Sequence, residues 1–158
     1  MPSYLQQLRQ LIGNRRIIYP AARIIIENEQ GEVLFIRRID NGKWGIPAGG
    51  FEQNETIEAC IRREVQEEVN IELLDLQVIG IATHPQQETV IYPNGDEVQY
   101  FTIEFYSNNW RGTPQADNVE TKEVIFQPFD FYKNLPANEQ STFLSLEYFR
   151  KNGQVRLF

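Results

Sequence analysis

The segment from Gly49 to Ile71 constrains the fold of this chain most, because as a helix it has two chemically different sides. It reads GGFEQNETIEACIRREVQEEVNI. At about 100° per residue, three carboxylates fall within one arc of roughly 100°; they are Glu64, Glu67 and Glu68. A separate apolar stripe lies beside that arc and consists of Ile57, Ile61, Val65 and Val69. The segment therefore predicts a helix that buries one side in a core and presents acids on another.

The acidic side of this helix has an electrostatic cost. Like charges three and four residues apart repel each other and weaken an isolated helix. Clustered carboxylates suit hard cations, so a bound Mg2+ or Mn2+ would offset the repulsion. The alternative for any glutamate-rich helix is a solvated surface, which would be the better interpretation of an isolated Arg-Glu-x-x-Glu.

The spacing of this segment resembles the Nudix box, the signature of the Nudix hydrolase family (MutT-like proteins). That box is Gly, five free positions, Glu, seven free positions, Arg-Glu, an aliphatic residue, one free position, Glu-Glu, one free position, Gly and an aliphatic residue. Eight of its nine defined positions match in type and spacing, namely Gly49, Glu55, Arg63, Glu64, Val65, Glu67, Glu68 and Ile71. A solvated surface would have to explain all of these positions and the Pro-Ala-Gly loop that precedes them.

Asparagine stands at two positions where the family has glycine. Asn70 replaces the last glycine of the box, and Asn54 replaces a common family glycine just before the first glutamate. Asparagine is the non-glycine residue that best tolerates a left-handed backbone, and a helix can end on it. We expect left-handed conformations at both positions, with the carboxylates unaffected.

The resemblance implies an α+β fold, the Nudix α/β/α sandwich with a mixed sheet between helices. It also implies hydrolysis of a nucleoside diphosphate linked to another group, by water attack at phosphorus. The metal ligands would be the backbone carbonyl of Ala48 with Glu64, Glu67 and Glu68, and a divalent ion there would activate water and clamp phosphate oxygens. Glu67 is either a second ligand or the base that accepts the water's proton. Arg63 can orient a carboxylate, so the catalytic candidates are Arg63, Glu64 and Glu67.

Residues outside the box complete the candidate site. Family members often use one more acid from a later loop, and the candidates are Glu120 and Glu123. Three basic residues could meet phosphates or form a solvated strand end; they are Arg37, Arg38 and Lys43. Four aromatic residues could stack a base, although such residues in hairpins more often belong to a core; they are Trp44, Tyr92, Tyr100 and Phe101. Glu55 either complements the helix dipole or supports the site.

Charge and cysteine content limit the partners and the compartment. The 22 acidic and 15 basic residues give a formal net charge of −7, which disfavours broad nucleic-acid binding because that needs a basic surface. A small phosphorylated nucleotide is compatible with local bases and metal ions. The one cysteine, Cys60, cannot form an intramolecular disulfide, which fits a cytoplasmic protein. Since no apolar run approaches the roughly 20 residues that cross a bilayer, we expect no membrane association.

The chain reads as one domain over residues 1–158, with no linker or repeat. Helices are predicted at both ends, over 1–13 and 140–151. Strands are predicted over 17–27 (interrupted at Pro20), 33–38, 73–82, 88–92, 97–106 and 123–127. The first two of these strands are expected to form a hairpin. The Asn94-Gly95 pair predicts a second hairpin, between 88–92 and 97–106.

The sequence leaves several functions open. Substrates of comparable weight are ADP-ribose or another nucleotide sugar and nucleoside triphosphates (NTP or dNTP), while dinucleoside polyphosphates, capped RNA ends and isoprenoid diphosphate isomerisation are more distant. A different class is a non-catalytic module that binds a nucleotide and regulates a partner. Such relatives usually lose box glutamates, whereas all four are present here. The N-terminal helix either serves a homodimer interface or packs on its own sheet.

Overall fold

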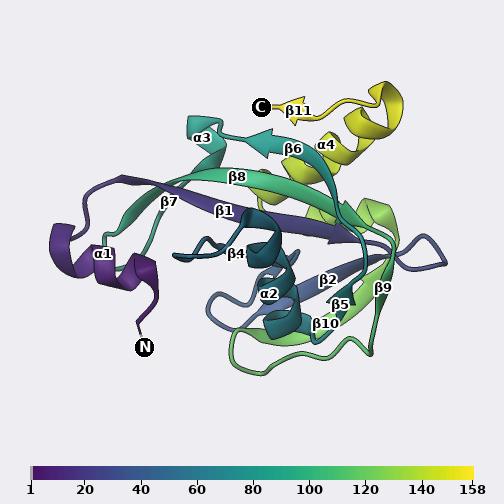
Figure 1. The fold of residues 1–158 in the computed structure, drawn as a ribbon, viewed down its shortest axis with the longest axis horizontal. Coiled ribbons are helices and arrows are strands. Elements are labelled where there is room, and N and C mark those ends of the chain that lie inside the picture. Colours follow the sequence, from purple (N-terminus) through teal and green to yellow (C-terminus); the bar gives the residue numbers. More distant parts are fainter. Residues whose placement is uncertain (1) are drawn as a thin grey trace.

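The chain folds into layers in which β-sheet lies between helices (Figure 1). The computed structural model describes residues 2–158. Within them, the largest sheet has six strands, in the order β11-β6-β8-β1-β4 with β7 also paired to β8. These strands are β1 (Ile17–Ile26), β4 (Ala48–Gly50), β6 (Gln77–Ala82), β7 (Thr89–Ile91), β8 (Glu97–Ser107) and β11 (Arg156–Leu157). Because β1 runs parallel to β8 and antiparallel to β4, the sheet is mixed, which confirms the predicted fold class.

Two smaller sheets complete the β-structure. One has the order β10-β2-β3 and the other pairs β5 with β9. Their strands are β2 (Val33–Arg38), β3 (Trp44–Gly45), β5 (Glu72–Leu73), β9 (Trp110–Arg111) and β10 (Thr121–Gln127). The predicted hairpin between the first two strands is wrong, because β1 and β2 meet only at the isolated bridge between Glu27 and Val33. Both edges of β1 are taken by β8 and β4, so β2 joins a different sheet.

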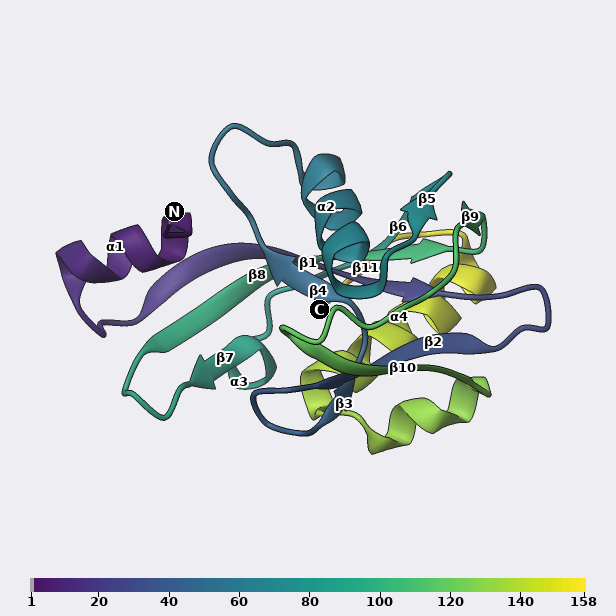
Figure 2. The ribbon, with the colours of Figure 1, turned by 90° about the horizontal axis from the view of Figure 1, so that it is seen from below.

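Helices on opposite sides bury the strands that carry the most apolar residues (Figure 2). On one side α2 (Ile57–Val69) packs its predicted apolar stripe, including Ile61 and Val65, against Ile24. On the other side α4 (Ala137–Asn152) packs Phe143 against Phe35. Side chains of β1 point alternately to the two helices, and a strand buried on both faces reads as a continuous apolar run. Each such aromatic or aliphatic side chain stabilises the fold by about 1.5–3 kcal/mol.

Helix α1 (Tyr4–Ile12) lies at the end of β1 and β8, away from the main core (Figure 1). It begins at a capping box formed by Ser3 and Gln6, and it buries none of its residues. Tyr4 stacks on Tyr19 at a centroid distance of 6.3 Å, and Arg9 donates to the carbonyl of Glu97. The helix therefore packs on its own sheet, as one of the two alternatives had it. Position 1 of the predicted helix lies outside the described residues.

Other boundaries differ from the predicted ones for local reasons. Strand β1 continues through Pro20, and the predicted strand 73–82 is divided into β5 and β6. Helix α4 begins at Ala137 because Pro136 supplies its N-cap, a position that needs no backbone N–H. Two short helices, α3 (Pro85–Glu88) and η1 (Phe129–Asn134), were not expected. The Asn-Gly hairpin is confirmed, with β7 antiparallel to β8.

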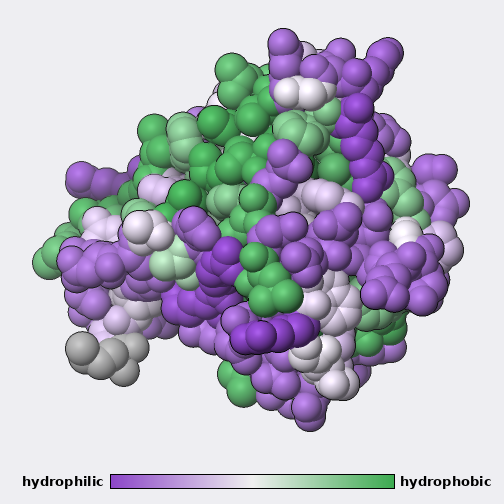
Figure 3. All heavy atoms as spheres, turned by 45° about the vertical axis from the view of Figure 1, so that its right-hand side comes forward, coloured by the Kyte–Doolittle hydropathy of each residue, from purple (hydrophilic) through white to green (hydrophobic). Residues whose placement is uncertain are grey.

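Part of the large sheet stays uncovered on the α2 side. Exposed apolar residues there are Ile18, Val78, Phe101 and Leu157, which strand alternation places on the same face as Ile24 and Phe105. In Figure 3 apolar residues (green) gather over the upper part of the molecule, and polar residues (purple) dominate the lower part. In residues 2–158, no helix is long and apolar enough to span a membrane.

Candidate metal centre and active site

Helix α2 holds the box glutamates between two well-defined ends. Thr56 caps its start by accepting a hydrogen bond from the backbone of Ala59 at 3.1 Å. Asn70 ends it in the left-handed conformation, with φ 59° and ψ 40°. Asn54, in the loop before the helix, has φ 66°. Both asparagines therefore take the backbone conformation predicted for them, which fixes where the carboxylates lie.

Glu64 lies directly under strand β4 and is 8% exposed. A Cβ atom added at Gly49 would lie 1.9 Å from the Cδ of Glu64, so only glycine lets the strand pass this close. Burial raises the pKa of Glu64 to about 7, and the charges of Glu67 and Glu120 add to the rise, while Arg63 opposes it. The glycine that opens the box is thus needed to make room for its second glutamate.

Glu68 is the most unusual carboxylate of the site. It is 5% exposed, and its Oε2 atom is buried with no hydrogen-bond partner. Burial and the charge of Glu64 raise its pKa well above the usual range, against Arg38 and a backbone hydrogen bond from Ala48. A buried, unpaired carboxylate oxygen is costly. A cation beside it would remove that cost, so the site fits a hard divalent ion.

Arg63 ties the glycine-rich segment to the helix. Its guanidinium forms a two-bond pair with Glu55, at 3.0 Å and 2.8 Å, and donates to Glu64 at 2.7 Å and Glu67 at 3.4 Å. It also donates to the carbonyl of Gly50 at 3.2 Å. Glu55 precedes the helix and binds Arg63. Of the two roles predicted for Glu55, this contact favours support of the site over interaction with the helix dipole. Arg63 thus contacts two of the carboxylates that it was predicted to orient.

Three cavities meet at Ala48. The first, about 620 Å³, is lined by Glu64, Glu67 and Glu120. The second, about 630 Å³, is lined by Glu68, Glu120 and Arg38. The third, about 400 Å³, is also lined by Arg38 and extends to Glu88 in α3. Ala48 lines all three.

The structure separates the two candidate acids of the later loop. The charge of Glu120 raises the pKa of both Glu64 and Glu68, so it lies beside the box. Glu123 instead lies 3.9 Å from Arg37 in an exposed pair. Among residues 2–158, no three acid, histidine or cysteine side chains already converge as a metal cage. Arg63 donates to Oε1 of Glu64 at 2.7 Å in this arrangement.

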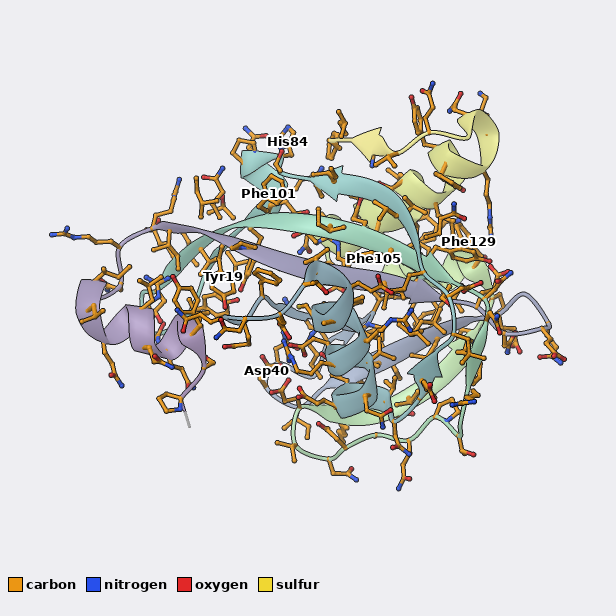
Figure 4. All side chains as sticks on the ribbon, viewed as in Figure 1. Tyr19, Asp40, His84, Phe101, Phe105 and Phe129 are labelled. Atoms are coloured by element: carbon orange, nitrogen blue, oxygen red, sulfur yellow. The ribbon has the colours of Figure 1, made fainter. Side chains whose placement is uncertain are left out.

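Some of the basic and aromatic candidates line the cavities at Ala48, and others lie outside them. Arg38 and Lys43 line the 400 Å³ cavity near Asp40, which lies to the left of α2 in Figure 4. Arg37 points to the other face of β2, because neighbouring strand residues alternate, and its guanidinium lies 5.8 Å from the ring centroid of Trp44. Of the four aromatic candidates, Tyr92 and Tyr100 line cavities of the site. Trp44 packs on Phe131, and Phe101 is an exposed residue of β8; neither residue lines the three cavities.

Comparison with known proteins identifies the family. The model of the NUDIX domain matches residues 18–145. The chain belongs to the Nudix family. This confirms the resemblance seen in the box and the enzyme class predicted from it, that of Nudix pyrophosphohydrolases.

Individual Nudix proteins resemble the chain to different degrees. The RNA pyrophosphohydrolase of Pseudomonas fluorescens (strain SBW25) is 30% identical over 118 residues, which are 62% of this chain and 72% of that protein. A MutT NUDIX hydrolase from Burkholderia pseudomallei has a TM-score of 0.66 at 19% identity, over 82% of this chain and 98% of that one. The NUDIX domain of Shewanella oneidensis NrtR, complexed with ADP ribose, has a TM-score of 0.69 at 13% identity, over 90% and 97%. The two structural likenesses confirm the fold.

Sequence reasoning missed a buried polar group beneath the Nudix site. Arg23, 4% exposed, donates to Glu88 at 2.6 Å and to Glu104 at 3.1 Å. Its one signal in the sequence is a charged residue inside an otherwise apolar strand. Glu139, 6% exposed in the first turn of α4, was also missed. Cys60 is fully buried and burial raises its pKa to about 12, so it is a packing residue.

Proposed function

We propose that this protein hydrolyses the pyrophosphate linkage of a nucleoside diphosphate derivative, using Mg2+ or Mn2+ and water that attacks phosphorus. The observation that supports this most is the buried oxygen of Glu68, which has no hydrogen-bond partner and lies one helical turn from the buried carboxylate of Glu64. A folded protein that retains such a group without a partner pays for it in stability. A cation bound between these carboxylates would recover that cost and produce a catalyst.

The ion would be held by Glu64 and Glu68, with the carbonyl of Ala48 and with Glu67 or Glu120 as further ligands. When bound, it would lower the pKa of the attacking water and neutralise charge on phosphate oxygens. Oxygen donors of this kind suit Mg2+ and Mn2+ better than softer metals. Glu64 and Glu68 lie on consecutive turns of α2, and each lines a cavity that also contains Ala48 and Glu120. These positions support the proposed set of ligands.

The remaining side chains divide the work. Glu67 is 58% exposed on its side chain and lines the cavity of Glu120, so it can accept the proton of the attacking water and pass it to solvent. Arg63 keeps Glu64 and Glu67 oriented, and such support of metal-binding groups is worth about 10–100-fold in activity. Lys43 and Arg38 line the 400 Å³ cavity, where they would bind phosphate oxygens. Arg37 is left out of this set because of its position.

The substrate would be a small nucleotide: an NTP or dNTP, ADP-ribose or another nucleotide sugar. Similarity to an RNA pyrophosphohydrolase adds RNA to the substrates that the assay should include. The net charge of −7 argues against broad nucleic-acid binding. A cytoplasmic location and a homodimer stay predictions from the sequence.

A panel of these substrates, with Mg2+, with Mn2+ and with EDTA, tests the proposal. We expect release of phosphate, pyrophosphate or a nucleoside monophosphate that stops in EDTA. Cleavage that is independent of metal would contradict the proposed chemistry. Tight binding of one nucleotide without any turnover would favour the alternative, a regulatory nucleotide-binding module.

A further inference from the structure

Arg38 occupies the boundary between two of the three cavities. Its side chain lines the 630 Å³ cavity together with Glu68 and Glu120, and it also lines the 400 Å³ cavity together with Lys43. Its charge lowers the pKa of Glu68, so the guanidinium lies close to the carboxylates of the box. A substrate whose phosphates lie at the box and whose other half fills the 400 Å³ cavity would pass this side chain.

A buried acid from the opposite end of the sequence fixes the position of Arg38. Glu139 Oε1 lies 3.0 Å from an Nη atom of Arg38, and the acid's side chain is 8% exposed. Its Oε2 accepts a hydrogen bond from the backbone of Ile46 at 2.8 Å. The same Arg38 nitrogen donates to the carbonyl of Ile46 at 3.3 Å. The guanidinium is thus held by a carboxylate and a carbonyl, while 22% of the side chain stays exposed.

Gly45 provides the space for this pair. A Cβ atom at that position would lie 1.8 Å from Nη1 of Arg38 and 2.6 Å from Oε2 of Glu139. The backbone of Gly45 is in β3 and has no left-handed conformation to explain the glycine. The absence of a side chain there is instead what allows the guanidinium and the carboxylate to meet.

We propose that Glu139 is a positioning residue that holds Arg38 at the boundary of the two cavities, where Arg38 binds a phosphate group of the substrate. This inference rests on the function proposed above. An arginine held by a carboxylate behind it loses little side-chain entropy when it binds phosphate. Without Glu139, the guanidinium would be free to move toward the carboxylate of Glu68 and would bind the substrate less well.

The kinetic signature follows from the position of Arg38. It binds a phosphate that is already charged before water attacks, so its contact stabilises the bound substrate and the transition state alike. Loss of such a contact raises KM and leaves kcat nearly unchanged. We expect Glu139→Gln to raise KM on the order of tenfold, as for the loss of one charged hydrogen bond. The glutamine keeps an acceptor for the backbone of Ile46, which protects the fold.

A double-mutant cycle separates positioning from a purely structural role. If Glu139 acts through Arg38, the change Glu139→Gln raises KM in the wild-type background and has no further effect in Arg38→Gln. Gly45→Ala displaces the guanidinium without changing any charge, so it should raise KM in the same way even if a Glu139 variant fails to fold. The matched control is Glu123→Gln, which breaks an exposed pair with Arg37, the neighbour of Arg38 on β2. This control should alter neither KM nor kcat.

Three results of the mutant kinetics would overturn the role proposed for Glu139. Multiplicative effects of the two substitutions, or an Arg38→Gln variant with unchanged KM, would overturn the inference. So would a folded Glu139→Gln enzyme with wild-type KM. If the wild-type protein cleaves none of the pyrophosphates in the panel, the proposed function has failed. The two failures are therefore distinguishable, because the cycle is read against an active wild-type enzyme.

Discussion

Replacing Gly49 by alanine tests how closely strand β4 and the box helix depend on each other. The new Cβ would lie 1.9 Å from Cδ, 2.2 Å from Oε1 and 2.4 Å from Cγ of Glu64, whereas an ordinary contact begins at 3.4 Å. The carboxylate must therefore move by about 1.5 Å or push the strand away. A misplacement of about 1 Å can cost on the order of 100-fold in rate. We expect kcat to fall by that factor, which corresponds to about 2.7 kcal/mol in the barrier.

The assay is the initial rate of pyrophosphate cleavage at saturating substrate and Mg2+, with thermal unfolding measured in parallel. Gly50→Ala is the matched control, because the three atoms nearest its Cβ would all belong to Tyr19, the closest being Cε1 at 2.5 Å. We expect that control to lose stability and to keep kcat within about fivefold. A folded Gly49→Ala enzyme with kcat within threefold of the wild type would refute the reasoning.

Three further predictions concern buried charge. Glu68→Gln should lower kcat at least 100-fold yet unfold at the same or a higher temperature in EDTA, because an amide is less costly to bury than an unpaired carboxylate; a lower melting temperature would contradict this. Burial raises the pKa of Glu64 from 4.5 to about 7, so the folded state binds the proton more tightly than the unfolded state does. The free energy of unfolding in EDTA should therefore fall as pH rises from 4.5 through 7. Denaturation at pH 5 and at pH 8 should show a smaller fall in this free energy for Glu64→Gln than for the wild type. Arg23→Met should lower the free energy of unfolding by about 3–5 kcal/mol, because it leaves two buried carboxylates without their cation. The control Arg16→Met, at an exposed pair, should lower it by less than about 1 kcal/mol. Equal losses of stability in urea denaturation would contradict this difference.

The box helix could be predicted because its signals are local. Its apolar stripe repeats with the helix period, and the left-handed conformations of Asn54 and Asn70 follow from the tolerance of asparagine for that conformation. The Asn94-Gly95 hairpin is equally local, since the turn itself specifies the pairing. These elements depend on few contacts beyond their own segment.

Long-range pairing and buried partners could not be predicted. The sequence does not tell which sheet β2 joins, since β1 and β2 read alike as apolar strands and the choice depends on β8 and β10 far along the chain. The same holds for Glu120 and Glu123, which are three residues apart, one just before β10 and the other within it. Glu139 lies 93 residues from its hydrogen-bond partner Ile46. Neither the hydrophobic periodicity nor a motif of one segment predicts a contact with a residue so far along the chain.

Mn2+ binding tests the central claim, that the box carboxylates hold the catalytic ion, most directly. Free Mn2+ can be titrated by electron paramagnetic resonance against the wild type, the double variant Glu64→Gln/Glu68→Gln, and Glu58→Gln as a control on the exposed side of the same helix. We predict saturable binding by the wild type and by Glu58→Gln, and loss of that binding in the double variant. Equal Mn2+ binding by all three proteins would contradict the account.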